Sequence, residues 1–68
     1  MEFLVVYSKV GDLYEGFAPD LAGCVRTGRT RAEVEKKMRL AVRHAVFMAR
    51  LQEDPVPEAE SWSEYVAI

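Results

Sequence analysis

The feature that most constrains this chain is the segment at residues 16–28, which reads Gly-Phe-Ala-Pro-Asp-Leu-Ala-Gly-Cys-Val-Arg-Thr-Gly. Pro19 has no backbone N–H to donate to a central β-ladder, and its ring fixes its own φ. Asp20 and Gly23 are residue types that turns require. An apolar strand therefore ends at Pro19 and another begins at Cys24, so the chain folds back on itself here.

Two strands are expected before this turn. Residues 3–9 are rich in β-branched and aromatic side chains, and Val10-Gly11-Asp12 predicts a tight turn into a second strand at residues 13–18. The first strand is apolar in both of its alternating sets, which favours a central position in the sheet. A short third strand is expected at residues 24–28.

A long helix should follow. Thr30 stands three residues before Glu33, in the spacing of a capping box, and Pro55 disfavours helical geometry at Asp54. Between them, apolar residues recur at steps of four and three, which predicts one core-facing helical stripe from Arg31 to about Leu51. Its members are Val34, Met38, Ala41, Ala45 and Met48.

After a Pro-rich connector, residues 63–68 read as a last strand. No repeat or second domain is visible, so residues 1–68 form a single domain of the α+β class. The predicted order is β-β-β-α-β, a small sheet with one long helix on one of its faces. Where the last strand enters the sheet is left open by the sequence.

The helix carries more apolar surface than one face of a small sheet needs. The surplus consists of Leu40, Phe47 and Leu51, joined by Val42 and Val46. One interpretation is a contact between subunits of a homo-oligomer, a dimer or a tetramer. The other is that the tail folds back over the helix and brings Trp62 and Tyr65 as a lid. The sequence does not choose between the two.

Size and composition favour a domain that relies on partners. A chain of 68 residues with a single cysteine, Cys24, has neither a disulfide nor a Cys/His cluster to support a small core. The first residues lack the features of a signal peptide, and no apolar run approaches membrane-spanning length. We therefore expect a cytoplasmic protein that does not associate with membranes.

Charge is unevenly distributed along the chain. Residues 1–52 hold nine Lys/Arg and six Asp/Glu, whereas residues 53–68 hold five acids and no base, which together give the net charge of −2. A basic surface beside an acidic tail can pair within the molecule, between subunits or with a charged partner.

The pattern of ionisable residues does not favour catalysis. Metal-dependent phosphoryl hydrolysis needs converging carboxylates, one of them usually in the middle of the first strand, where this chain has Val5 and Val6. His44 has no nucleophile or carboxylate one helical turn away, and Cys24 reads as a small buried hydrophobe. We expect no enzyme activity, no metal and no cofactor.

Several motifs together resemble the HicB-like antitoxins, which neutralise small messenger-cutting toxins. The resemblance covers the hairpin, the turn, the capped helix start and the Pro-x-Pro connector. The chain departs from the family pattern at Ala22, at Arg29 and in having no DNA-binding domain after this module. The matching segments are Pro19-Asp20-Leu21-Ala22-Gly23-Cys24, Gly28-Arg29-Thr30, Glu33-Val34 and Pro55-Val56-Pro57.

The resemblance implies a partial ribonuclease H-like fold and a non-catalytic role. The partner would be a small basic ribonuclease toxin, attracted to the acids of the hairpin, the turn and the tail. Our candidate contacts are Tyr14, Phe17, Asp20 and Leu21. Because Tyr14 and Phe17 fall on opposite faces of the sheet, at most one of them should face a partner.

A second hypothesis is a free-standing homo-oligomeric domain with a regulatory or nucleic-acid-associated role. Lys36, Arg43 and Arg50 repeat every seven residues and lie near Arg39, an arrangement able to follow phosphates. A solvated helix face is the more common meaning of such a stripe. No aromatic residues are interleaved with these bases, so nucleic-acid binding is the minority expectation.

Overall fold

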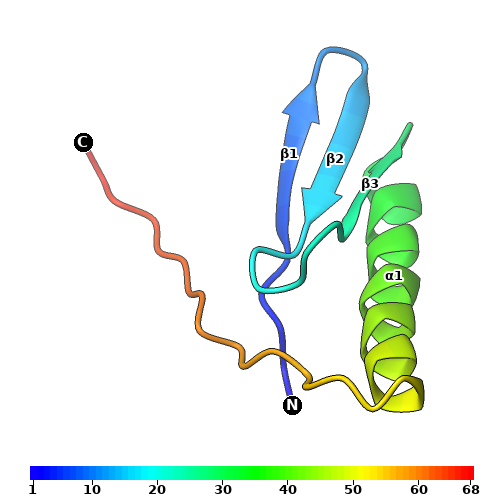
Figure 1. The fold of residues 1–68 in the computed structure, drawn as a ribbon. Coiled ribbons are helices and arrows are strands. Elements are labelled where there is room, and N and C mark those ends of the chain that lie inside the picture. Colours follow the sequence, from blue (N-terminus) through cyan, green and yellow to red (C-terminus); the bar gives the residue numbers. More distant parts are fainter.

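A computed structural model describes residues 1–68 as three strands followed by one helix. The elements are β1 (Val6–Val10), β2 (Leu13–Phe17), β3 (Val25–Gly28) and α1 (Arg31–Leu51). Both strand pairs are antiparallel, and the sheet order is β1-β2-β3 (Figure 1). The α+β class and the extent of the helix are confirmed.

The predicted central position of the first strand is wrong. β1 lies at one edge of the sheet, and β2, which is shared by the two antiparallel pairs, is the central strand. The apolar character of residues 3–9 has a different cause. Phe3 and Val5 pack against the core before the ladder begins, whereas Val6 belongs to the paired strand.

The predicted last strand is also wrong, because residues 63–68 pair with no strand of their own chain. The tail crosses to the β1 side of the molecule and ends away from α1 (Figure 1). Trp62 is 84% exposed and Tyr65 is fully exposed. The alternative in which these aromatics form a lid over the helix is therefore wrong for this structure.

Backbone hydrogen bonds close the turn between β2 and β3. Ala18 N–H donates to Cys24 O at 3.0 Å, and Leu21 N–H donates back to Ala18 O at 3.1 Å. Gly23 has a φ of +72°, a value that side chains with a Cβ rarely adopt. The predicted turn between Pro19 and Cys24 is therefore confirmed. It reverses the chain, so that β3 pairs antiparallel with β2.

Both ends of α1 are capped. Thr30 accepts from Glu33 N–H at 3.1 Å, and the Glu33 carboxylate accepts from Arg29 N–H at 3.1 Å. At the other end, Asp54 N–H donates to Ala49 O at 2.8 Å and Glu53 N–H donates to Arg50 O at 3.2 Å, the two bonds of a Schellman motif. The helix therefore ends through backbone geometry just before Pro55.

The core lies between α1 and one face of the sheet. It contains six buried hydrophobic residues, of which Met38 is wholly buried. Met38 Cγ would lie only 2.6 Å from a Cβ at Gly16, so a glycine in the central strand allows the helix to approach. Because α1 is the only helix and packs on this face, no helix covers the other face of the sheet. The six residues are Ala18, Leu21, Cys24, Val34, Met38 and Ala41.

Candidate functional site

The face of the sheet opposite α1 is largely apolar. Gly16 lies against Met38 on the helix side, so Glu15 and Phe17 point to the other side. The strand register adds residues of β1 and β3 to the same face. We call this surface the open face. Its members are Val6, Ser8, Val10, Leu13, Glu15, Phe17, Val25 and Thr27.

Solvent reaches the open face at three of its large hydrophobic residues. Val10, Leu13 and Val25 are all exposed, and no helix covers them. Glu15 lies between the paired residues Ser8 and Thr27, so a carboxylate stands near the middle of the patch. An apolar surface around a central acid favours contact with a partner that brings both apolar and basic groups.

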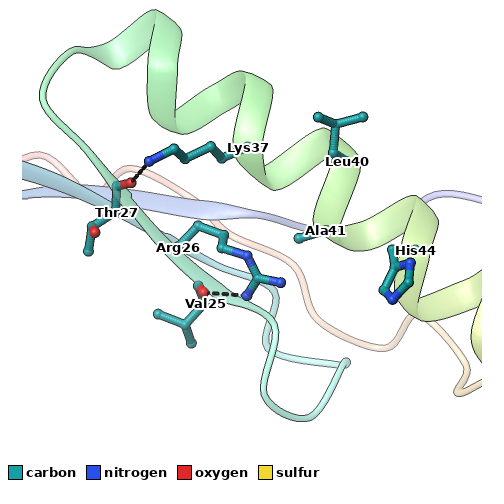
Figure 2. A pocket seen from close by; sticks show the side chains of 7 residues that line it. All are labelled: Val25, Arg26, Thr27, Lys37, Leu40, Ala41 and His44. Atoms are coloured by element: carbon teal, nitrogen blue, oxygen red, sulfur yellow. Dashed lines mark hydrogen bonds between the residues drawn. The ribbon is translucent and has the colours of Figure 1, made fainter.

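A groove of about 760 Å³ separates the free edge of β3 from α1 (Figure 2). The strand contributes Val25, Arg26 and Thr27, and the helix contributes Lys37, Leu40, Ala41 and His44. Figure 2 shows Lys37 reaching from the helix across to the strand. We call this hollow the β3 groove. Its polar side chains are Arg26, Thr27, Lys37 and His44, and its apolar side chains come from both walls, Val25 on the strand and Leu40 and Ala41 on the helix.

Two side chains occupy the outward-facing carbonyls of β3. Lys37 Nζ donates to Thr27 O at 3.0 Å, and Arg26 Nη1 donates to Val25 O at 2.7 Å. Lys37 also pairs with the Glu33 carboxylate at 3.1 Å. The edge of the sheet is thus covered by flexible cations and not by another strand.

Asp20 holds the tail against the turn. Its Oδ2 accepts from Glu60 N–H at 3.1 Å and from Ser61 N–H at 3.0 Å, and its Oδ1 accepts from the Ser61 hydroxyl at 2.8 Å. The hydrogen bonds from Ser61, followed by the one from the Glu60 backbone, lower the pKa of Asp20. The carboxylate therefore has a structural task in the single chain.

The four predicted partner contacts do not lie on one surface. Phe17 is on the open face, whereas Tyr14 faces the helix and packs against the core. Leu21 is only 6% exposed and belongs to the core, so its side chain is not presented to a partner. Asp20 is at the surface but engaged with the tail. Of the four, the structure leaves Phe17 on a surface without a covering layer.

The three predicted oligomer contacts, Leu40, Phe47 and Leu51, are all exposed on α1. Leu40 lines the β3 groove, and Phe47 lines a second hollow between the helix and the first residues of the chain. The apolar surplus predicted for the helix is thus present at the surface, and the tail does not cover it.

The residues considered for catalysis are dispersed or buried. Cys24 is a buried free thiol within the core, and His44 is exposed on the helix beside the β3 groove. No three His, Cys, Asp or Glu side chains come together. The polar features that the structure does assemble are the Asp20 anchor and the cations of the β3 groove.

Sequence reasoning missed the β3 groove. Arg26 and Lys37 are separated in the sequence and come together only because the helix runs back along β3. The one available signal was the turn that ends at Cys24, which places a short strand at a sheet edge. Nothing in the sequence indicated that this edge would remain unpaired.

Comparison with protein-family models, with characterised proteins and with solved structures finds no match for this chain. The likeness to HicB-like antitoxins therefore stays a prediction from the motifs. α1 does not have the long apolar stretch that a membrane crossing needs.

Proposed function

We propose that this chain is a non-catalytic binding module of the HicB antitoxin type, which acts in the cytoplasm on a small basic ribonuclease toxin. The observation that carries the proposal is the open face, where exposed Val10, Leu13 and Val25 surround Glu15. An apolar patch on so small a domain is typical of a protein-protein contact. The motif resemblance supplies the class of partner.

The chemistry of the open face fits a basic RNA-cutting surface. A ribonuclease that holds RNA needs cationic groups, and a carboxylate set in an apolar patch attracts them while excluding water. Asp12 at the tip of the β1–β2 hairpin adds a second acid close to Leu13. In this arrangement the module inhibits its partner by occupying the surface that RNA would contact.

Coexpression with the protein encoded by the adjacent gene tests the proposal. We expect the two proteins to copurify and the full chain to suppress RNA cleavage by the partner. Glu15→Arg should weaken the complex by about tenfold or more, because a like charge replaces an attractive one. Glu58→Arg, the same charge change in the connector, should leave affinity unchanged.

Two results would contradict the proposal. One is a partner that binds the Glu15→Arg variant as tightly as it binds the native chain, which would place the contact elsewhere. The other is magnesium-dependent cleavage of RNA by the purified chain itself, which would make the domain an enzyme.

The exposed helix residues favour a second candidate function, a homo-oligomeric regulatory or nucleic-acid-associated domain. Leu40, Phe47 and Leu51 offer an apolar stripe to another subunit, and Lys36 and Arg43 are exposed nearby. Phosphate contacts would give an affinity for RNA or DNA that falls steeply with salt. A filter-binding titration that is flat across salt concentrations would end this alternative.

A further inference from the structure

The last residues of the chain have the composition of a strand but no partner. Residues 62–68, which we call the tail segment, read Trp-Ser-Glu-Tyr-Val-Ala-Ile. Its large apolar side chains, Trp62, Tyr65, Val66 and Ile68, are all exposed. A β-prone segment whose apolar side chains and backbone groups are both unpaired is a ready template for strand addition.

The free edge of β3 offers the complementary backbone groups. Ala18 N–H bonds to Cys24 O, and alternation along an antiparallel pair then directs the backbone of Arg26 and Gly28 toward β2. The N–H and C=O of Thr27 point the other way, out of the sheet. Figure 2 agrees, since Lys37 approaches the Thr27 carbonyl from outside the sheet.

The space beside this edge is bounded by an edge strand on one side and a helix on the other. An edge strand and a helix that runs alongside it bind extended peptides in several domain families, where main-chain bonds give affinity and the groove reads alternate side chains. Here the helix side contributes Leu40 and Ala41. The space between the strand and the helix has a volume of about 760 Å³ and is open to solvent.

The charges of the β3 groove indicate which kind of peptide would bind there. Arg26, Lys37 and the imidazole of His44 line the groove, and the only acid in contact with these groups is Glu33, which pairs with Lys37. Residues 53–68 contain five acids and no base, and Glu64 lies in the middle of the tail segment. Arg26 and Lys37 donate to the β3 carbonyls in the single chain, and charged side chains at a sheet edge disfavour pairing with unrelated strands. When an acidic strand binds, the same two side chains can pair with its carboxylate instead.

The occupant comes from a second molecule. Asp20 fixes Ser61 at the turn, and from there the tail runs on the β1 side of the sheet, whereas the groove lies on the β3 side (Figure 1). A chain that keeps its Asp20 anchor therefore presents its tail segment outward, away from its own groove.

From these observations we propose that the tail segment of one copy adds as a fourth strand to the free edge of β3 in a second copy. Residues of a strand alternate between faces, so Glu64 and Val66 share one face and Tyr65 lies on the other. With Glu64 and Val66 toward α1, the carboxylate meets Lys37 and the valine meets Leu40. Tyr65 then extends the apolar surface at Val25.

The oligomeric state of the full chain as a function of concentration tests this inference. Trp62 is the only tryptophan, so its emission reports on the tail segment directly. We expect sedimentation velocity to show association with rising concentration and the Trp62 emission to shift to shorter wavelength over the same range. Amide signals of Thr27 and of groove residues on α1 should shift in parallel in NMR spectra.

Two variants act on the two halves of the contact. Thr27→Pro removes the outward N–H while leaving the β2–β3 ladder intact, because an edge strand tolerates proline at an outward position. Glu64→Lys reverses the charge of an exposed residue outside every helix and strand, so the fold should be retained. Each should raise the concentration needed for association by about tenfold or more.

Matched controls separate this contact from others. Lys9→Pro removes an outward N–H from β1 at the opposite edge, and Glu58→Lys makes the same charge change on the other side of the Asp20 anchor. Both should associate like the native chain. Association lost only in Lys9→Pro would place the tail segment on β1 and overturn the inference.

Three further outcomes would overturn it. The first is a chain that stays monomeric at every concentration. The second is association that persists in Glu64→Lys with Trp62 still exposed, the result expected if the stripe of Leu40, Phe47 and Leu51 forms the contact alone. The third is association that occurs only when the protein encoded by the adjacent gene is present. The β3 groove would then belong to the contact with that protein and not to self-association. Far-UV circular dichroism shows whether Thr27→Pro folds. If Thr27→Pro does not fold, the concentration dependence of Glu64→Lys alone tests the inference.

Discussion

The Asp20 carboxylate accepts a hydrogen bond of 2.8 Å from the hydroxyl of Ser61, a residue 41 positions later in the chain. Two backbone N–H groups, of Glu60 and Ser61, donate to the same carboxylate. A turn residue that the sequence marks as local structure is thus the point where the tail is tied to the domain, and it determines which way the tail segment points.

Loss of this anchor should free the tail without unfolding the domain. Asp20→Ala removes all three acceptor contacts, whereas the backbone bonds of the turn, such as Ala18 N–H to Cys24 O, do not involve the carboxylate. We expect the fluorescence anisotropy of Trp62 in dilute protein to fall toward that of a free peptide, while the far-UV circular dichroism spectrum stays native. Glu58→Ala is the control, and native anisotropy in Asp20→Ala would show that the tail is held elsewhere.

Acid should release the tail in the same way. Hydrogen bonds from Ser61 and Glu60 hold the pKa of Asp20 below its usual value of 3.8. A lowered folded-state pKa means that the anchor is fully present above the unfolded-state pKa and is lost as pH falls through the folded-state pKa. Trp62 anisotropy should therefore be constant from neutral pH down to about 4 and then decrease. In Asp20→Asn this acid transition should be absent, and an unchanged transition there would assign it to another carboxyl.

Gly16 should tolerate no side chain. A Cβ there would lie 2.6 Å from Met38 Cγ and 2.9 Å from the Tyr7 ring. Gly16→Ala gains about 0.4–1 kcal/mol from a less flexible unfolded chain, but the overpacking costs roughly 1–3 kcal/mol, so the net effect is destabilising. Thermal unfolding followed by circular dichroism should show a lower Tm. Ser8→Ala, on the open face of the next strand, should unfold near the native Tm; equal Tm values for both variants would contradict the close approach of α1.

Thr30→Ala should destabilise the helix start. The Thr30 hydroxyl oxygen accepts from Glu33 N–H, and removing it leaves that donor without a partner from the chain. The expected cost is about 1 kcal/mol in the free energy of unfolding, measured by urea titration. Thr30→Ser keeps the oxygen and should retain most of the stability. A Thr30→Ala variant as stable as the native chain would show that the cap contributes little.

Glu53→Gly should stabilise the domain. Glu53 has a φ of +58°, the left-handed conformation at the end of α1 where glycine carries no Cβ penalty. That penalty is roughly 1–2 kcal/mol for other residues, and the greater freedom of an unfolded glycine offsets part of it. We expect a gain of about 0.5–1 kcal/mol in urea titrations. Glu58→Gly, outside the motif, should give no gain, and a loss of stability in Glu53→Gly would contradict the motif.

The sequence by itself determined the local structure. Pro19 and Gly23 set the turn, Gly11 allowed the hairpin, and the Thr30 cap with the stripe through Val34 and Met38 defined the helix. Each of these depends on a few neighbouring residues, through a fixed φ, a missing N–H or a periodicity of 3.6. Strand alternation also put Tyr14 and Phe17 on opposite faces of the sheet, and the structure decided that Tyr14 is the one that faces the helix.

Only the tertiary structure decided which surfaces stay uncovered. The apolar composition of residues 3–9 and 62–68 predicts strands. Pairing, however, joins segments that are distant in the chain, so the local sequence pattern does not indicate where in the sheet a strand lies. In the structure β1 lies at an edge of the sheet, and the tail, held at Ser61 by Asp20, pairs with neither edge strand. The groove formed by Arg26 and Lys37 exists for the same reason, since it depends on how α1 packs beside the last strand of the sheet.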